Sequence, residues 1–363
     1  MTAGATVDED LRRMSQALTL AERGLYTTDP NPRVGCVLVR DGQVVGEGWH
    51  ARAGEPHAEA IALRAAGSLG RGATAYVTLE PCSHTGRTPP CADVLIEAGV
   101  ARVVAACRDP NPKVSGAGIE RLKAAGIAVT AGVLEQSCRA LNPGFFRRFE
   151  SVRPFVRLKI AMSLDARTAL QDGRSKWITG EAARADVQHW RARSSAICVG
   201  VGTVRADDPR LNVRLTYGPW VRQPLRILLD SRLAIASGAK IFRDDNVLVF
   251  AAPDARAPEP LPYAVERVAR VGKGLDLPAV LRKLAAREVN ELMVECGPKL
   301  AAAFVEQRLV DELIVYTAPV LLGSDAGPML QMEGVASIGE APQFEYTDVR
   351  QIGDDLRLIL KPK

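Results

Sequence analysis

One histidine, one glutamate and two cysteines have the types and the spacing of a catalytic zinc site. His57 and Glu59 lie two positions apart, and Cys82, which follows a proline, and Cys91 come later in the chain. Three protein ligands leave one coordination position for water, whereas a structural zinc site closes with four. In zinc deaminases the nearby glutamate is not a ligand but moves protons during the reaction. The set therefore predicts hydrolytic removal of an amino group. One zinc ion per chain would be held by His57, Cys82 and Cys91, and Glu59 would act as the catalytic acid and base.

Two features of this region leave other interpretations open. His50 and His84 are the only further histidines in the first half, and either of them as a fourth ligand would make the site structural. The zinc-deaminase pattern has two residues between its cysteines, whereas eight separate Cys82 from Cys91. A longer loop beside the metal can bind substrate itself, and His84 and Arg87 have the chemistry to bind a phosphate. The alternative is a solvated loop.

The elements around this set alternate between strands and helices. Apolar residues at helical spacing between 11 and 25 predict an opening helix. His57 stands at the start of a later helix and Cys91 at the start of another, where the helix dipole favours the thiolate form of a cysteine. The other elements of the first half are expected as strands at 34–39, from 44, at 75–79, 101–107 and 127–131, and as helices at 57–66, from 91 to Gly99 and at 115–125. This order predicts a layered α/β domain.

A domain boundary is expected near residues 142–154, where prolines and a glycine flank a basic and aromatic stretch. The chain then restarts with a strand at 155–161. Further elements are expected as strands at 195–200, 226–230, 246–251, 291–295 and 311–317, two strands within 344–361, and helices at 180–193, 277–287 and 298–308. The length and this pattern predict two α/β domains, 1–150 and 151–363, the second with an antiparallel edge.

Three segments of the second half suggest cofactor binding. Residues 200–205 begin like a dinucleotide-binding fingerprint, but an arginine stands where the third glycine belongs, so we expect a tight turn and not a Rossmann fold. Gly297 and Pro298 lie between a strand and a helix, where free amides favour a pyrophosphate, although an ordinary turn is the alternative. Ser231 and Arg232, at the end of a strand, can bind the phosphate that distinguishes NADPH from NADH. A surface pair is the alternative there.

The composition limits the class of protein. The 363 residues are 47% hydrophobic and 25% charged, with a formal net charge of +5, which is too small to indicate nucleic-acid binding but suits an anionic substrate. Seven cysteines without a secretory leader argue against a disulfide framework. No apolar stretch approaches membrane-spanning length. A cytoplasmic protein is therefore expected, with no membrane and no nucleic-acid partner.

Two other functions stay open on the residues alone. A nucleic-acid deaminase with an accessory domain would need a basic, aromatic-lined groove, but aromatic residues make up only 5% of the chain. The one basic aromatic cluster, Phe145 to Phe149, lies at the expected boundary. A non-catalytic, zinc-stabilised binding or assembly protein would have four protein ligands and no exchangeable water.

The chain resembles the bifunctional deaminase/reductase of riboflavin biosynthesis over nearly its whole length. In the first half the resemblance rests on residues 30–36, 54–59 and 78–91, and the long loop between the cysteines is the family's own form. In the second half it rests on residues 158–165, 177–179, 206–214, 295–298 and 318–323. The resemblance implies a cytidine-deaminase-like α/β/α first domain and a dihydrofolate-reductase-like α/β second domain.

The same resemblance implies two consecutive reactions on one phosphorylated pyrimidine. The first is zinc-dependent deamination of a diaminopyrimidinone that carries a phosphoribosylamino group, in which Asn31, His50 and His84 would contact the substrate. The second is NADPH-dependent reduction of the ribosyl side chain to ribityl. Lys159 and Asp207 are candidates for polarising or protonating the ribose carbonyl, because the hydride itself comes from the cofactor. The family's assemblies imply a homo-oligomer, a dimer or larger.

Position by position, the resemblance also assigns contacts in the reductase site. Arg191 and Arg214 would clamp a phosphate, because a guanidinium offers it two donors. The substrate contacts would be Ser175, Arg191, Leu211, Arg214 and Glu295. The cofactor contacts would be Ala161, Trp177, Thr203, Asp207, Ser231 and a turn of Gly297, Pro298, Lys299, Leu300, Ala301, Ala302 and Ala303.

Overall fold

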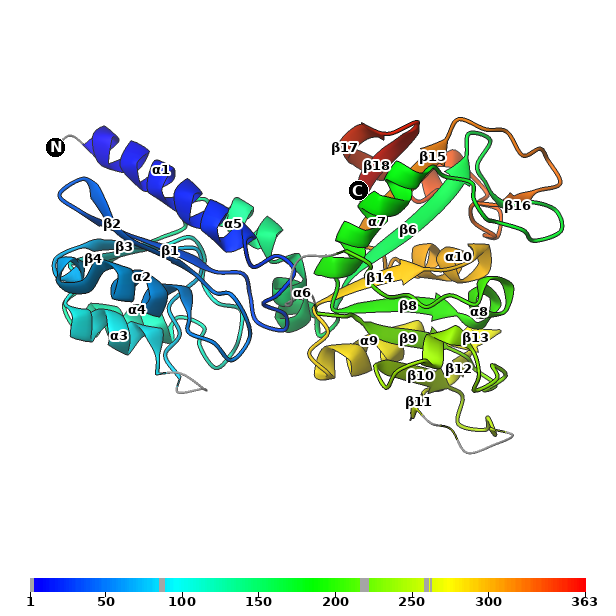
Figure 1. Cartoon of the computed structure of the whole chain (residues 1–363), viewed down its shortest axis with the longest axis horizontal. Coiled ribbons are helices and arrows are strands. Elements are labelled where there is room, and N and C mark those ends of the chain that lie inside the picture. The colour runs from blue at the N-terminus through cyan, green and yellow to red at the C-terminus, as the bar shows by residue number, and fades with distance from the viewer. Residues whose placement is uncertain (1–2, 85–88, 216–221, 258–260, 262) are drawn as a thin grey trace. The chain divides into compact units, whose positions relative to one another are not determined.

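The computed structural model describes residues 3–84, 89–215, 222–257, 261 and 263–363. The chain forms two compact units, Met1–Val152 and Arg153–Lys363, which Figure 1 shows with their helices and strands labelled. Each unit has its own sheet and its own buried core. Each can therefore position a site of its own.

The first unit is built on a five-stranded mixed sheet with the order β2-β1-β3-β4-β5. β1 (Gly35–Arg40) pairs antiparallel with β2 (Gln43–Trp49) and with β3 (Thr74–Val77). β3, β4 (Arg102–Ala105) and β5 (Ala128–Ala131) run parallel. Nearly every residue of β1 is buried, as expected for an inner strand of a sheet that is covered on both faces.

Helices cover both faces of this sheet and make three layers. α1 (Ala3–Glu22), α5 (Glu135–Leu141) and α6 (Pro143–Ser151) pack on one face. α2 (Ala58–Ala66), α3 (Cys91–Ala98) and α4 (Ala117–Ala124) pack on the other, and a short 3-10 helix, Gly67–Gly70, follows α2. Figure 1 shows α1 on the opposite side of the sheet from these three helices. This is the α/β/α arrangement that the family resemblance implies for the first domain.

Two glycines of β2 let α2 lie directly against the sheet. A Cβ atom at Gly46 would be 2.2 Å from the carbonyl oxygen of Ala62, and one at Gly48 would be 2.3 Å from that of Ala58. Any larger side chain at these positions would push the helix outward. Because α2 begins at Ala58 with His57 as its N-cap, this packing also places His57.

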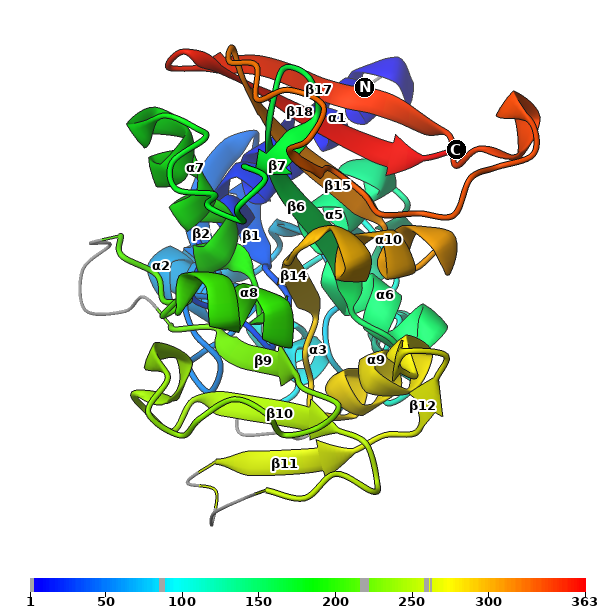
Figure 2. The same ribbon diagram turned by 90° about the vertical axis from the view of Figure 1, so that its right-hand side faces the viewer.

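The second unit is built on a nine-stranded sheet with the order β11-β10-β9-β8-β14-β6-β15-β18-β17. Neighbours from β11 to β15 are parallel, and β18 and β17 continue the sheet antiparallel, which confirms the expected antiparallel edge. The strands are β6 (Phe155–Ser163), β8 (Ala196–Gly200), β9 (Leu225–Leu229), β10 (Val247–Ala251), β11 (Ala264–Arg267), β14 (Glu291–Glu295), β15 (Glu312–Ala318), β17 (Phe344–Ile352) and β18 (Asp355–Pro362). Figure 2 shows this sheet from β11 at the bottom to β17 at the top.

Helices again cover both faces. α7 (Glu181–Arg193) and α8 (Val201–Asp207) pack on one face, and α9 (Leu277–Ala286) and α10 (Pro298–Glu306) on the other. The smaller elements are the ribbons β7 (Arg167–Ala169) with β16 (Gly327–Pro328) and β12 (Arg270–Val271) with β13 (Gly274–Leu275), and the 3-10 helices Lys240–Phe242 and Ile338–Glu340. Within the described ranges, no helix has the length and apolar character needed to cross a membrane.

The chain changes direction across the middle of this sheet. From β6 it runs outward through β8, β9, β10 and β11, and it then returns to insert β14 between β8 and β6 and to add β15 on the far side of β6. In open parallel sheets, ligands bind outside the carboxyl ends of the strands at such a reversal. The carboxyl ends of β6, β8, β14 and β15 are therefore the expected binding edge.

One local prediction is wrong. Residues 201–207 form helix α8, whereas the glycines of this segment predict a tight turn. Gly200 is an extended N-cap, and Val204 is buried in the core, so tertiary packing outweighs the low helix propensity of glycine. Most other predicted elements are present within a few residues of their expected ends, and α5 and α6 are helices that the local sequence pattern does not predict.

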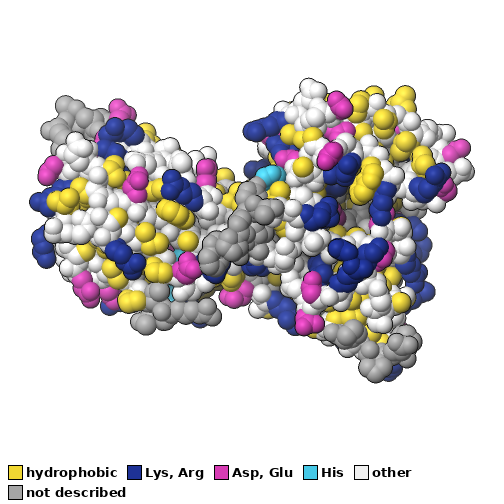
Figure 3. Space-filling view, in the orientation of Figure 1, with side chains coloured by type: hydrophobic (Ala, Val, Ile, Leu, Met, Phe, Trp, Pro, Cys, Tyr) yellow, Lys and Arg dark blue, Asp and Glu magenta, His cyan; other side chains and the backbone are white. Residues whose placement is uncertain are grey.

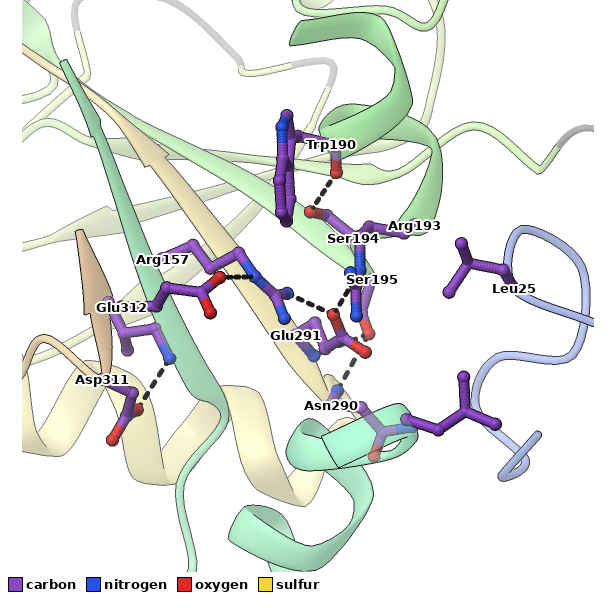
Figure 4. A network of polar contacts seen from close by, with 12 residues as sticks. Leu25, Arg157, Trp190, Arg193, Ser194, Ser195, Asn290, Glu291, Asp311 and Glu312 are labelled. Atoms are coloured by element: carbon purple, nitrogen blue, oxygen red, sulfur yellow. Dashed lines mark hydrogen bonds and ion pairs between the residues drawn. The ribbon is translucent and has the colours of Figure 1, made fainter. Parts of the chain in front are cut away.

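A buried ionic network joins three strands near their amino ends, opposite the binding edge (Figure 4). Arg157 of β6 is 2% exposed and donates to Glu291 of β14 and, through Nε at 2.6 Å, to Glu312 of β15. Arg193 from α7 adds an ion pair to Glu291 at 3.2 Å. Arg157 thus lies between two buried carboxylates, and Arg193 brings a second guanidinium to Glu291.

Candidate active sites of the two units

The three expected zinc ligands come together at the ends of three elements. His57 is the N-cap of α2, Cys91 is the first residue of α3, and Cys82 lies in the segment after β3. His57 Nδ1 is 3.2 Å from Cys91 Sγ and 3.6 Å from Cys82 Sγ, and the ligand atoms of all three lie within 4.8 Å of one another. Neighbouring ligand atoms of tetrahedral zinc lie about 3.6 Å apart, so the three residues fit a zinc ion.

The electrostatics of the two thiols also favour metal binding. Hydrogen bonding to the Cys91 thiol, together with contacts to His57, lowers the pKa of Cys82 to about 4. The same pairing and burial raise the pKa of Cys91. The backbone N–H of Cys91 donates to Cys82 Sγ at 3.3 Å, as a free amide of a first helical turn can. These contacts favour the thiolate form of Cys82, which is the form that binds metal.

Glu59 lies in the first turn of α2 and is 3% exposed. Its pKa is raised mainly by burial, and the charge of His57 acts in the opposite direction. A carboxyl group whose pKa is shifted toward neutrality is suited to taking up and releasing protons at physiological pH. Glu59 thus stands beside the metal-binding group without belonging to it.

Asn31 and His50 meet next to the zinc ligands, as the resemblance implies for two substrate contacts. Asn31 Nδ2 is 3.0 Å from His50 Nε2, His50 Nδ1 is 3.2 Å from the carbonyl oxygen of Pro56, and the rings of His50 and His57 are 5.2 Å apart. Burial lowers the pKa of His50, which favours a neutral ring that donates from Nδ1 and accepts at Nε2. Both nitrogens are engaged, so His50 does not serve as a fourth ligand.

The loop between the two cysteines is described only at its ends. His84 is exposed, and within the described residues the metal-binding group consists of His57, Cys82 and Cys91. Arg87, the other residue expected to suit a phosphate, lies outside the described residues. The described part of the site thus has the three-ligand arrangement of a catalytic centre.

At the carboxyl edge of the second sheet, Lys159 and Glu295 are neighbours across β6 and β14. Arg191 from α7 donates Nε and Nη2 to the two carboxylate oxygens of Glu295 at 2.6 and 2.9 Å. Lys159 Nζ lies 5.9 Å from the ring centroid of Tyr316. The sequence pattern does not predict a role for Tyr316, because this contact exists only when β15 lies next to β6 in the sheet. Burial lowers the pKa of Lys159, and Glu295 opposes this shift.

The two arginines expected to clamp a phosphate have different surroundings. Arg191 forms its bidentate pair with Glu295 and donates Nη1 to the carbonyl oxygen of Asn212 at 3.3 Å. Arg214 is exposed, and partial burial and the charge of Arg191 lower its pKa. Arg214 is therefore the more open guanidinium of the pair. Leu211 is buried in the core, so its backbone is the part that can face a substrate.

The segment before α7 contacts the end of α8. Ser175 Oγ donates to Asp207 Oδ1 at 3.2 Å, and Lys176 Nζ donates to the backbone oxygen of Asp207 at 2.8 Å. Trp177 is 69% exposed, and the guanidinium carbon of Arg184 lies 4.6 Å from its ring centroid. The sequence offers no signal for Lys176, because a single lysine has no distinguishing spacing. An exposed aromatic ring at this edge is available to stack on a ligand.

The turns that begin α8 and α10 lie next to each other, because they follow the neighbouring parallel strands β8 and β14. A Cβ atom at Gly200 would be 3.1 Å from Leu300 Cδ2, and one at Gly297 would be 4.0 Å from Thr203 Oγ1. Gly297 is the N-cap of α10, and no side chain caps that helix. The first amides of α10 are thus open to an anion, which fits a cofactor pyrophosphate.

Two further expected cofactor contacts lie along the same sheet. Ala161 of β6 pairs with Tyr316 of β15, and Ser231 comes shortly after β9. Arg270 Nη2 donates to the backbone oxygen of Ser231 at 3.2 Å. Arg270 is a second basic residue at this position, besides the exposed Arg232. The sequence pattern does not predict this contact, because Arg270 lies in β12, far from Ser231 along the chain.

Two known families match different parts of the chain. Residues 7–107 match the cytidine and deoxycytidylate deaminase zinc-binding region, and residues 154–358 match the RibD C-terminal domain. The riboflavin biosynthesis protein RibD of Haemophilus influenzae is 47% identical, over 98% of this chain and 98% of that protein. RibD of Escherichia coli is also 47% identical, over 97% of this chain and 99% of that protein.

Solved structures match nearly the whole of this chain. Form 1 of Acinetobacter baumannii RibD has a TM-score of 0.92 at 45% identity, covering 98% of this chain and 99% of that one. A diaminohydroxyphosphoribosylaminopyrimidine deaminase/5-amino-6-(5-phosphoribosylamino)uracil reductase from Thermotoga maritima has a TM-score of 0.87 at 34% identity, covering 99% and 100%. The chain therefore belongs to the RibD family of riboflavin-biosynthesis enzymes, which join a zinc-dependent deaminase to an NADPH-dependent reductase.

Proposed function

We propose that residues 1–150 are the deaminase, that residues 151–363 are the reductase, and that both act in this order on one phosphorylated pyrimidine. The first substrate is the diaminopyrimidinone with a phosphoribosylamino group, and the second is its deaminated product. One observation carries the proposal: a three-ligand group of His57, Cys82 and Cys91 with the buried Glu59 beside it. Three ligands leave a position for water, as hydrolytic deamination requires.

In the deaminase, His57, Cys82 and Cys91 would hold the zinc ion, which when bound activates water for attack on the amino-bearing carbon. Glu59 would take the proton of that water and deliver it to the ring nitrogen and the leaving amine. Asn31, which His50 holds through Nε2 at 3.0 Å, would present its amide oxygen and its second N–H to the edge of a pyrimidine, and the neutral ring of His50 would contact the substrate beside it. His84 would contact the substrate from the loop.

In the reductase, NADPH supplies the hydride. Its pyrophosphate would bind at the turn of residues 297–303 beside Thr203, with Ala161, Trp177 and Ser231 as further contacts. The Lys159 ammonium would polarise or protonate the ribose carbonyl, and Asp207 is the second candidate for that role. Charge of this kind is effective in a site that excludes water.

The substrate of the reductase would be held by its phosphate and its polar groups. Arg214 is the open guanidinium for the phosphate, and Arg191 stands next to it while it orients Glu295. Glu295, Ser175 and the backbone of Leu211 would contact the rest of the substrate. This division would leave the exposed guanidinium of Arg214 for a two-donor contact with phosphate.

A coupled assay with the purified full chain tests the proposal. Ammonia release from the diaminopyrimidinone is measured without NADPH, and NADPH is then added and its absorbance followed. We expect ammonia release in the first phase and oxidation of NADPH only on the deaminated product. Oxidation of NADPH on the substrate that still carries its amino group would contradict the proposed order.

The two other functions are less well supported. A non-catalytic zinc protein needs a fourth ligand, and in the described part of the chain neither His50 nor His84 joins the metal-binding group. A nucleic-acid deaminase needs a continuous basic surface, whereas Figure 3 shows basic and acidic side chains interspersed on the face that it presents. Salt-sensitive RNA binding would be the observation in favour of the latter.

We also propose that the protein is a homo-oligomer, a dimer or larger, and that it works in the cytoplasm. Tyr346, Val349 and Leu356 are exposed on the hairpin β17–β18, and exposed apolar side chains on one element are typical of a contact surface. All seven cysteines are free, which suits a reducing compartment. Light scattering on the protein eluted from a size-exclusion column measures the oligomeric state. Deaminase and reductase activity in fractionated cells tests the location.

A further inference from the structure

Glu80 is a buried carboxylate that the proposed deamination chemistry does not use. Its side chain is 3% exposed. Oε2 accepts the backbone N–H groups of Asp109 at 3.2 Å and Gly116 at 2.9 Å. Oε1 accepts those of Gly118 at 3.0 Å and Ile119 at 3.2 Å. One side chain thus receives four main-chain hydrogen bonds from a later part of the chain.

Two of these donors belong to the first turn of α4. Gly116 is the N-cap of that helix and has no side chain with which to cap it. The first amides of a helix have no partner within the helix, and their partial positive charge favours a carboxylate. Glu80 therefore caps α4 from a distant position in the sequence, in the place of an ordinary N-cap side chain.

The contact between the two segments is close. A Cβ atom at Gly118 would be 1.9 Å from the carbonyl oxygen of Pro81, so α4 touches the backbone directly before Cys82. The backbone N–H of Glu80 also donates to the carbonyl oxygen of Cys107 at 2.9 Å. The short segment from Glu80 to Cys82 is thus fastened through both its side chain and its main chain.

We propose that Glu80 is a positioning residue of the metal site, which holds the Cys82 thiolate where it can share a metal ion with His57 and Cys91. This inference rests on the proposed zinc site and adds a residue that touches neither substrate nor reacting atoms. A glutamine at position 80 would keep the volume, but its NH₂ group accepts no hydrogen bond. One pair of buried amides would then lose its acceptor, and the segment that carries Cys82 would shift.

The test compares Glu80→Gln with Glu120→Gln in the full chain. Glu120 is an exposed residue of α4 that pairs with Lys123, so its variant makes the same chemical change without touching Cys82. We expect zinc release to a chromogenic chelator about 10- to 100-fold faster from Glu80→Gln, the size of effect found for groups that orient metal ligands. The thiolate absorption of the cobalt-substituted variant should also change. Glu120→Gln should match the unaltered protein in both.

The remaining outcomes separate this inference from a general loss of structure and from failure of the proposed metal site. Reductase activity of the same preparation should be unchanged, which shows that the second unit is intact. If Glu80→Gln does not yield folded protein, Glu80→Asp carries the test, since it keeps the carboxylate on a shorter side chain, and faster zinc release supports the inference. An unaltered release rate and cobalt spectrum in the folded variant overturn it. Failure of the unaltered protein to bind one zinc ion would overturn the proposed metal site instead.

Discussion

Lys159 and Glu295 occupy the same register position on β6 and β14, so an ammonium group lies beside a carboxylate that is itself paired with Arg191. Burial lowers the pKa of Lys159 most, the charge of Glu295 raises it, and Arg191 lowers it. The protonated fraction of Lys159 therefore depends on the charges of these two neighbours. Changing one of them tests whether this lysine titrates in the reductase reaction.

Glu295→Gln removes the charge that raises the pKa of Lys159 and leaves Arg191, which lowers it. If protonated Lys159 is the acid, activity declines as pH rises through its pKa, and this decline should move to lower pH in the variant. The measurement is kcat/KM for NADPH oxidation against pH, which reports groups of the free enzyme. Glu181→Gln, exposed in the first turn of α7, is the control. An unmoved decline in Glu295→Gln would assign the titration to another group.

Glu59→Gln should stop the first reaction and spare the second. General acid–base catalysis contributes about 100-fold or more to a rate, so ammonia release should fall by at least about that factor. NADPH oxidation on the deaminated product should continue at the rate of the unaltered protein. Glu97→Gln, at an exposed position of α3, should affect neither step. Deamination at the original rate in Glu59→Gln would show that this carboxylate is not the proton carrier.

The zinc site was the part of the molecule most accessible from sequence. His57 and Cys91 each stand where a helix begins, and both the residue types and these starts can be read from local pattern. The resemblance to the riboflavin-biosynthesis family, with its two reactions and the cofactors zinc and NADPH, is confirmed by relatives that match nearly the whole chain. The fold class of both units is confirmed in the same way.

The contacts within the reductase site depend on the order of the strands in the sheet, and a local sequence pattern does not contain that order. Lys159 and Glu295 are far apart in the sequence, and they meet only because β14 returns between β8 and β6. The bidentate pair of Arg191 with Glu295 follows from the same insertion. Glu80 stands next to a recognised motif, but its partners at 109–119 become visible only when α4 packs against Pro81. Helix α8 was missed because two glycines predict a turn when packing is unknown.

Removal of zinc should separate the two activities. Chelation of the metal should abolish ammonia release and leave NADPH oxidation on the deaminated product intact, because His57, Cys82 and Cys91 all lie in the first unit. The midpoint of thermal unfolding of that unit should fall, since a ligand that binds only the folded state stabilises it. Added zinc should restore both properties. A parallel loss of the reductase would indicate that the metal serves the chain as a whole.

Arg157→Met should destabilise the second unit strongly. It removes the ion pairs of Arg157 with Glu291 and Glu312 and keeps the pair of Arg193 with Glu291. Breaking a buried ion pair costs about 3 to 5 kcal/mol. Arg174→Met removes the exposed pair with Asp172 and should change the free energy of unfolding by less than about 1 kcal/mol. Urea denaturation, monitored through the loss of reductase activity, measures the free energy of unfolding of both variants. Equal stability of the two variants would mean that the network adds nothing beyond packing.

Asp109 should make the first unit less stable as the pH rises. It is 7% exposed, and burial, with the nearby charges of Glu80 and Cys82, raises its pKa to about 7. Because this value lies above that of the unfolded chain, the folded state keeps a proton that the unfolded state loses. The stabilising contribution is therefore complete below about pH 4 and is lost as the pH rises through about 7.

Asp109→Asn isolates this contribution, because asparagine resembles the protonated carboxyl group at every pH. The side-chain oxygen can still accept the backbone N–H of Asn111, which it does at 2.8 Å. At pH above about 8 the variant should unfold with a free energy higher by about 1 to 3 kcal/mol, whereas in acid the two proteins should be equal. Hydrogen exchange at the amides of β3 and β4, measured from acid to above about pH 8, reports the unfolding free energy of the first unit alone. A difference that is the same at all pH values would mean that the substitution acts through packing and not through the proton.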